Sequence, residues 1–325
     1  MPTVSRWTTQ SRIGVGGAVV VLVALAVAPG LASAGIVDRM TALFIYIILA
    51  AMWNALAGYC GLVSIGQQLF FGLGAYATIR VAYAGFDPFA AMLIAAIAVG
   101  LLAWPISHFM LRLRGGEFSI GMWVLASIGH LCVNLDPMIQ GETGSSLISL
   151  NAYQADLRRD LIYWAALAAM ILLLGALFAL LRSREGLAIQ AIRDSEEAAM
   201  SLGVKPERTK RLLFVLAAFG IALAGALWLA QAVSFQPKSY FSVQWTAYMI
   251  FMVLVGGIGR FEGAILGAIL FFAVETIFAT TGVWYLIGLG ATAIVFSLYF
   301  PRGLWGAVAA RTGVQLLPLG YRAKP

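Results

Sequence analysis

The sequence predicts an all-α polytopic membrane protein with about ten transmembrane segments, and three observations indicate this fold class. Hydrophobic residues make up 62% of the 325 residues and charged residues only 11%. This composition is typical of integral membrane proteins. Apolar runs of about 20 residues, enough to cross a hydrocarbon layer of about 30 Å, recur from end to end. The basic residues that give the chain its net charge of +7 stand mostly at the ends of these runs.

The apolar runs divide the chain into an expected cytoplasmic N-terminus (1–12), a transmembrane domain (13–306) and a cytoplasmic C-terminal tail (307–325). The run after Arg6 and Arg12 resembles a cleavable signal peptide, but it is longer than such signals usually are, and we expect it to be retained. The expected spans are Ile13–Ala34, Met40–Gly58, Leu62–Ala84, Pro88–Leu111, Phe118–Leu135, Leu161–Leu181, Leu212–Phe235, Val243–Ile258, Glu262–Ala279 and Val283–Phe300.

The charges predict how the spans are oriented. If the polar segment 183–210 is cytoplasmic, six spans precede it and four follow, so both termini are cytoplasmic as well. Of the 21 basic residues, 16 then lie on the cytoplasmic side, and five lie outside: Arg39, Arg80, Arg158, Arg159 and Lys238. The positive-inside rule predicts this asymmetry for a multi-pass protein of a bacterial inner membrane.

Several kinds of chemistry are not expected in this chain. No G-x-x-x-x-G-K-[ST] sequence is present, so the chain is not expected to bind and hydrolyse ATP by itself. His108 and His130 lie in different spans, and Cys60 and Cys132 are far apart in apolar surroundings. Neither a metal site, nor a catalytic triad, nor a disulfide framework is indicated. We therefore predict no enzymatic activity, no cofactor, no metal and no nucleic acid, with membrane lipid as the surrounding partner.

The polar segment 183–210 predicts a short helix outside the membrane. Asp194 is the expected N-cap and Glu197 stands at the capping-box position. Ala198 and Ala199 follow, and Gly203 with Pro206 signals the end of the helix. A capped helix in the only long polar stretch of the sequence predicts a contact surface for another protein.

Two glycine-rich stretches interrupt spans in the two halves of the chain. The first, Gly58–Tyr76, includes Ser64, Gln67, Gln68 and Gly72; the second, Gly256–Ala268, begins with Gly256 and Gly257. Broken helices at corresponding places of two halves are typical of a translocation path. The alternative is close helix packing, which the spacing of four between Gly259, Gly263 and Gly267 favours for the second stretch. For Ser64, Gln67 and Gln68 both interpretations stay open.

The same motifs carry a family resemblance that covers about residues 40–306. The segment from Ala191 to Val204 resembles the cytoplasmic Glu-Ala-Ala-x-x-x-Gly loop of ABC importer permeases. In order along the chain, four further motifs are similar to the LivM-like branch of the branched-chain amino acid permease family: 64–76, Leu113–Phe118, Val255–Gly259 and Phe300–Gly306.

The resemblance implies an ABC importer permease fold and a set of partners. These are two ATP-binding subunits, a second homologous permease subunit and a periplasmic solute-binding protein. The loop helix would dock on an ATPase and couple ATP hydrolysis to alternating access, with the contact formed by Asp194, Glu196, Glu197, Ala198, Ala199 and Gly203. Transport of branched-chain or related amino acids is the function that the resemblance implies.

Departures from the family pattern leave the substrate open. Where members carry a Thr-Gly-Gly-x-x-Gly-like element, this chain reads Gln140–Leu147, and its stretch Ala126–Leu131 lacks the usual acidic residue. Urea or a short amide is the alternative substrate for the same machinery. A stand-alone secondary transporter is a more distant alternative. Cation-coupled transporters usually carry buried acidic residues near the middle of the bilayer, whereas Glu117 and Glu275 are expected near the ends of their spans.

Overall fold

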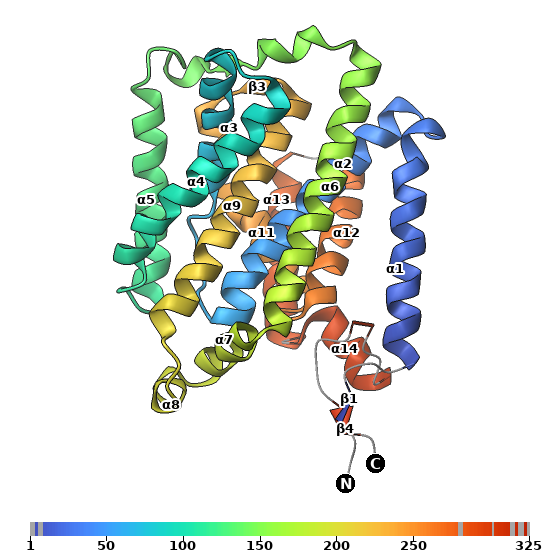
Figure 1. Ribbon diagram of the computed structural model, residues 1–325, viewed down its shortest axis with the longest axis vertical. Coiled ribbons are helices and arrows are strands. Elements are labelled where there is room, and N and C mark those ends of the chain that lie inside the picture. Colours follow the sequence, from blue (N-terminus) through green and yellow to red (C-terminus); the bar gives the residue numbers. More distant parts are fainter. Residues whose placement is uncertain are drawn as a thin grey trace.

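A computed structural model describes residues 4–5, 9–278, 282–300, 302–312, 316–317 and 322–323, and it is a bundle of long helices (Figure 1). In chain order the elements are β1 (Val4–Ser5), α1 (Thr9–Val27), η1 (Ala28–Gly30), α2 (Ala34–Asn54), the π-helical turn η2 (Ala55–Tyr59), α3 (Gln68–Tyr83), α4 (Pro88–Met110), α5 (Gly116–Asn134), η3 (Gly141–Thr143), β2 (Ser145–Ser146), η4 (Ile148–Ala152), α6 (Ala155–Arg182), α7 (Arg184–Asp194), α8 (Glu196–Ser201), α9 (Pro206–Ala232), β3 (Ser234–Phe235), α10 (Pro237–Tyr240), α11 (Val243–Gly256), α12 (Phe261–Phe278), α13 (Val283–Tyr299), α14 (Gly303–Thr312) and β4 (Arg322–Ala323).

Among the described residues, nine helical stretches are long and apolar enough to cross a membrane. The expected span Leu62–Ala84 is not one of them, because an interruption falls inside the glycine-rich stretch 58–76, as the sequence predicts, and leaves only α3 (Gln68–Tyr83) helical. Residues 61–67 are non-helical, and α3 has only 16 residues, or about 24 Å of helix. The chain leaves the helical path at Gly61, whose φ is +71°, and the amide of Gly66 bonds the Ser64 hydroxyl instead of a helical carbonyl.

Helix α2 is the centre of the bundle. Every residue from Phe44 to Asn54 is buried, and the helix packs against α6, α9, α11 and α12. A helix that is apolar on all sides is expected in such a position, because no face of it has to meet water. In Figure 1, α2 is seen between these neighbours.

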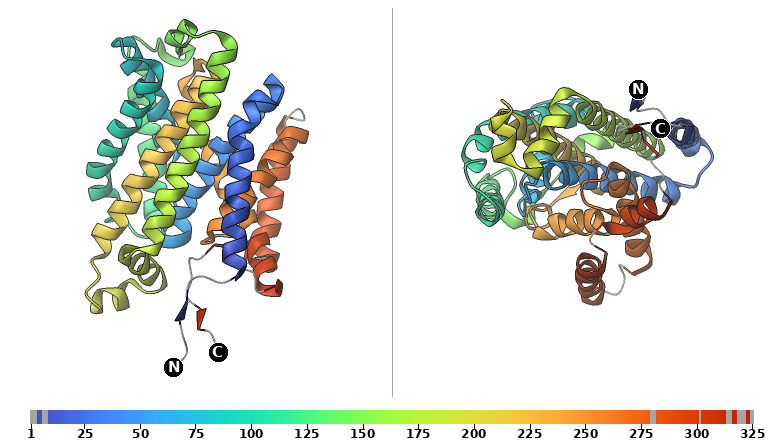
Figure 2. Two further views of the ribbon diagram at one scale, coloured as in Figure 1. Left: turned by 45° about the vertical axis from the view of Figure 1, so that its right-hand side comes forward. Right: turned by 90° about the horizontal axis from the view of Figure 1, so that it is seen from below.

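Helix α1 lies at the edge of the bundle, outside the main helix layers, although it precedes the central helix α2 in the chain (Figure 2). Its apolar side chains are exposed, including those of Val20 and Val23. In a bilayer such a surface meets lipid tails at no hydrophobic cost. The predicted boundary between the N-terminus and the first span falls inside α1, and the boundary at 306/307 falls inside α14.

The short elements mark the two ends of the bundle. At one end lie α7, α8 and the antiparallel pair of β1 with β4, in which Val4 is opposite Ala323 (Figure 1). At the other end β2 pairs with β3, with Ser145 opposite Phe235. The end that carries α7 and α8 is called the coupling end below, and the opposite end the outer end.

Candidate coupling and translocation sites

Helix α8 begins one residue later than the sequence predicts. Asp194 is the last residue of α7, and the N-cap of α8 is Ser195, whose extended backbone (φ −159°) separates the two helices. The Ser195 hydroxyl accepts a hydrogen bond of 3.3 Å from the amide of Ala198. Aspartate and serine are both good N-caps, so the pair Asp194-Ser195 left the choice to the tertiary structure. Glu197 therefore lies in the first turn, where its charge favours the helix N-terminus, but not at the capping-box position.

A Schellman motif ends α8. The backbone amide of Gly203 donates to the carbonyl of Met200 at 2.9 Å, and the backbone amide of Val204 donates to the carbonyl of Ala199 at 3.1 Å. Gly203 has a φ of +83°, which glycine adopts without strain. Pro206, expected to mark the stop, is the first residue of α9. The helix is thus closed at both ends, although it has only six residues.

The two alanines of α8 lie in different environments. Ala199 is buried against the rest of the chain, while Ala198 and Glu197 are exposed. Met200 and Leu202 are exposed as well, the latter by 82%. Glu196 forms an ion pair of 2.8 Å with Lys210 of α9, so one side of α8 is fastened to the bundle. The opposite side offers a small residue, two apolar residues and an acid.

The two glycine-rich stretches touch each other near the coupling end. A Cβ on Gly58 would lie 2.4 Å from the amide nitrogen of Gly259. Asn54 joins the two stretches: its side-chain oxygen accepts from the amide of Gly259 at 2.8 Å, and its nitrogen donates to the carbonyl of Arg260 at 3.0 Å. We call this contact of Asn54 and Gly58 with Gly259 and Arg260 the glycine crossing. The sequence marks both stretches and favours an interhelical hydrogen bond for Asn54, but it does not indicate which residues Asn54 bonds.

Arg193 links the polar segment to the glycine crossing. It lies in the last turn of α7, and its guanidinium donates a hydrogen bond of 2.9 Å to the carbonyl of Gly58. The same group would lie 2.8 Å from a Cβ on Gly259, so the close approach depends on glycine there. Sequence reasoning missed Arg193, because nothing in the pattern distinguishes it from the other arginines of the segment.

Of the predicted translocation residues, Ser64 and Gln67 are buried in the non-helical segment before α3, and Gln68 is buried as the first residue of α3. The carbonyl of Ser64 accepts from the Trp53 indole at 3.0 Å. The backbone amide of Gln68 donates a hydrogen bond to the hydroxyl of Thr246 in α11, and that hydroxyl donates to the side-chain oxygen of Gln68. Gln67 is fully buried, and neither end of its side-chain amide has a partner among the residues that the structure describes. An unpaired buried amide is costly, by about 1–3 kcal/mol.

The three glycines of the predicted path are close-packing positions. A Cβ on Gly72 would lie 2.6 Å from the ring of Phe241, and one on Gly256 would lie 1.9 Å from the carbonyl oxygen of Gly263. Gly257 has a φ of +127° and faces the carbonyl of Arg302. The packing interpretation is thus favoured for the glycines.

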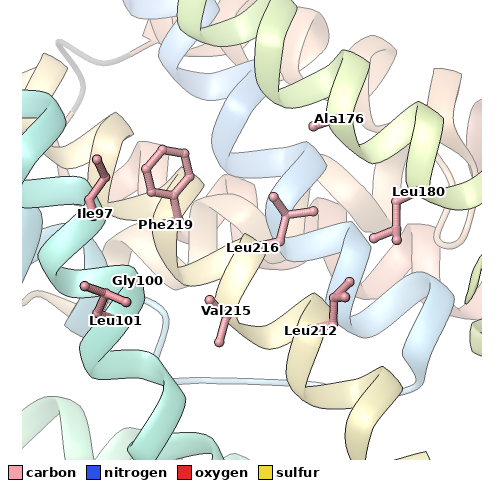
Figure 3. A pocket seen from close by; sticks show the side chains of 9 residues that line it. All are labelled: Ile97, Gly100, Leu101, Ala176, Leu180, Leu212, Val215, Leu216 and Phe219. Atoms are coloured by element: carbon pink, nitrogen blue, oxygen red, sulfur yellow. The ribbon is translucent and has the colours of Figure 1, made fainter.

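A groove on the bundle surface does not include any of these residues. It has a volume of about 450 Å³ and lies between α4, α6 and α9. Figure 3 shows its lining, with Ile97, Leu216 and Phe219 among apolar side chains only. Such a surface suits an aliphatic lipid chain and has no group for the charges of an amino acid.

A polar network at the outer end involves the segment where the sequence departs from the family pattern. Glu142 is held by His130 at 2.8 Å, by the Asn134 amide at 2.6 Å and by the backbone amide of Lys238 at 2.9 Å. Partial burial raises the pKa of Glu142, but these hydrogen bonds and the His130 contact outweigh that effect and hold the pKa below its ordinary value of 4.5. The network joins α5 and η3 to α10.

Residues 35–309 match the family described as the permease component of branched-chain amino acid transport systems, and the chain belongs to this family. The chain is 28% identical to the high-affinity branched-chain amino acid transport system permease protein LivM of Escherichia coli K12, over 88% of this chain and 73% of that protein. It is 27% identical to LivM of Salmonella typhimurium LT2, over 94% and 77%.

Among solved structures, PsaBC from Streptococcus pneumoniae in complex with Fab is similar with a TM-score of 0.48 at 14% identity, over 87% of this chain and 96% of that one. The predicted fold class is confirmed: this is an all-α polytopic membrane protein of the ABC permease type. It is a permease subunit of an ABC importer, and as such it works with ATP-binding subunits.

Proposed function

We propose that this chain imports branched-chain amino acids into a bacterial cell, as one of two homologous permease subunits in an assembly with two ATP-binding subunits and a periplasmic solute-binding protein. The names of its relatives support the substrate class. In this proposal the chain moves the solute by alternating access and catalyses no reaction itself. The outer end would receive the solute-binding protein.

The observation that carries the proposal is the exposed side of α8. A six-residue helix with a serine cap, a Schellman end and an ion pair to Lys210 is held rigidly outside the bundle. A rigid helix that presents Ala198 between Glu197 and exposed Met200 can enter a groove of a partner, because the small side chain permits close approach. We assign Glu197, Ala198 and the Gly203 turn to the contact with the ATPase, with Ala199 and Glu196 fixing α8 to its own chain.

The charge distribution supports the orientation in the inner membrane. Arg184, Arg208 and Arg211 lie on the elements of the coupling end, whereas Arg39, Arg158 and Arg159 lie at the outer starts of α2 and α6. In the proposed orientation, α7, α8 and both termini are cytoplasmic.

Uptake by the reconstituted assembly tests this function. The chain would be purified with candidate ATPase, permease and binding-protein subunits from the same genome and placed in lipid vesicles, and labelled leucine, urea and acetamide would be compared. We expect accumulation of leucine that requires ATP hydrolysis. ATP-driven uptake of urea or acetamide without uptake of leucine would show that the substrate is an amide and not a branched-chain amino acid. Leucine flux that does not depend on ATP would contradict the proposed mechanism.

A further inference from the structure

Arg193 is the side chain through which the coupling segment reaches the core of the bundle. It stands two residues before Ser195, the N-cap of α8, and its guanidinium bonds the Gly58 carbonyl at 2.9 Å. The helical stretch that begins with α2 ends at Tyr59, so the carbonyl of Gly58 lies in its last turn, where helical carbonyls lack a following amide. Arg193 supplies the donor that this carbonyl needs.

The bonded carbonyl belongs to the glycine crossing, where the two halves of the chain meet. Gly58 contacts Gly259 through backbone atoms, and Asn54 bonds both Gly259 and Arg260. The two backbones are in direct contact, with no side chain between them. A displacement of Gly58 therefore requires Gly259 to move with it. The crossing is therefore a place where a small movement in one half is passed to the other.

The hydrogen bond between Arg193 and Gly58 is strong enough to transmit a movement. A hydrogen bond from a charged donor is about twice as strong as one between neutral groups. The Arg193 side chain is 43% exposed and also lies 3.5 Å from the carboxylate of Asp194. Arg193 is thus held by a charged partner next to α8 as well as by the Gly58 carbonyl.

We propose that Arg193 is a positioning residue for transport, which couples displacement of α8 to the glycine crossing through the carbonyl of Gly58. The proposal rests on the proposed function, because it requires a partner that displaces α8. Ile189 and Ile192 lie on the buried face of α7 and hold this helix against the bundle. Helix α7 and Arg193 therefore move as one body. In this mechanism Arg193 contacts neither the solute nor the nucleotide.

The test compares Arg193→Gln with Arg208→Gln in the complete assembly. Arg208 is an exposed arginine of the same polar segment, in the first turn of α9, and is the charge-matched control. The measured quantity is the amount of leucine transported per ATP hydrolysed, together with the yield of assembled complex. We expect Arg193→Gln to lower this ratio about tenfold with assembly and ATP hydrolysis retained. Arg193→Lys restores most of the ratio, and Arg208→Gln leaves it unchanged.

The outcomes separate the two claims. If the unaltered assembly shows ATP-dependent uptake and Arg193→Gln keeps its ratio, the role of Arg193 is overturned and the proposed function stands. If the unaltered assembly shows no ATP-dependent uptake, the proposed function fails and the role of Arg193 fails with it.

A second measurement applies if Arg193→Gln does not assemble. Spin labels on cysteines introduced at exposed Met200, Ile258 and Leu135, in a Cys132→Ala chain with native Arg193, report distances when ATP binds. The proposal expects Met200 and Ile258 to keep their separation while both move relative to Leu135 at the outer end. A changed separation between Met200 and Ile258 would overturn it.

Discussion

Gly58 and Gly259 meet backbone to backbone: the amide nitrogen of Gly259 would lie 2.4 Å, and its Cα 2.7 Å, from a Cβ placed on Gly58. These residues are about 200 positions apart in the sequence, and the amide of Asn54 bridges the same contact. The two interrupted stretches of the chain are thus one structural unit near the coupling end.

Replacing Gly58 by alanine should destabilise the protein. The added methyl group overlaps the backbone of Gly259 and the Asn54 oxygen, and overpacking of this kind costs about 1–3 kcal/mol. Gly175→Ala in α6 is the control, because a Cβ there meets no other described part of the chain within 4 Å, and alanine stabilises a helix interior by about 1 kcal/mol. Thermal unfolding in detergent checks both, and equal melting temperatures for Gly58→Ala and the unaltered chain would contradict the tight contact.

The neighbouring alanines of α8 should respond differently to a large side chain. Ala198→Trp should leave the melting temperature of the isolated chain unchanged and abolish binding of the ATPase subunit, because Ala198 is exposed. Ala199→Trp should lower the melting temperature, since Ala199 is buried. Copurification of the tagged ATPase measures binding. Full binding by Ala198→Trp would remove α8 from the proposed interface.

Gln67 and Gln68 should also differ, although they are adjacent and both buried. Gln67→Met should raise stability by about 1 kcal/mol, because it removes an amide without a described partner. Gln68→Met should lower it by a similar amount, since it removes the bond to Thr246. If Gln67 binds the solute, Gln67→Met also reduces leucine uptake. A more stable variant with unchanged uptake would assign Gln67 no part in the path.

The network around Glu142 should make the outer end sensitive to acid. Hydrogen bonds hold the pKa of Glu142 below 4.5, so its contribution to stability is complete above that pH and is lost as the pH falls through the lower value. Glu142→Gln should therefore lower the melting temperature by a few degrees at pH 7. The difference from the unaltered chain should shrink below about pH 4.5. A difference that stays constant down to pH 3 would contradict the role of the charge.

The sequence predicted the helical bundle well because apolar runs of sufficient length have few other solutions in a bilayer. It indicated an interruption within the stretch 58–76 but not its bounds, since these depend on the backbone of Gly61 and on the hydrogen bond from the Gly66 amide to the Ser64 hydroxyl. The one-residue error at Asp194 has a similar cause: two capping residues stand side by side, and only backbone conformation selects Ser195.

The candidate site was predictable in part. Glycine patterns mark positions of close approach, so both stretches were found from the sequence. Their contact, and the bonds from Asn54 and Arg193 that stabilise it, join residues far apart in the chain. A single sequence carries no periodic signal for such pairs.

The central claim is that an ATP-binding subunit drives transport through its contact with α8. Leucine flux through the lone chain tests this claim most directly. The purified chain is placed in vesicles alone and with its partner subunits, and labelled leucine is followed with and without ATP. The account predicts accumulation only with the partners and ATP, and none by the chain alone. Rapid leucine flux through the lone chain without nucleotide would contradict it.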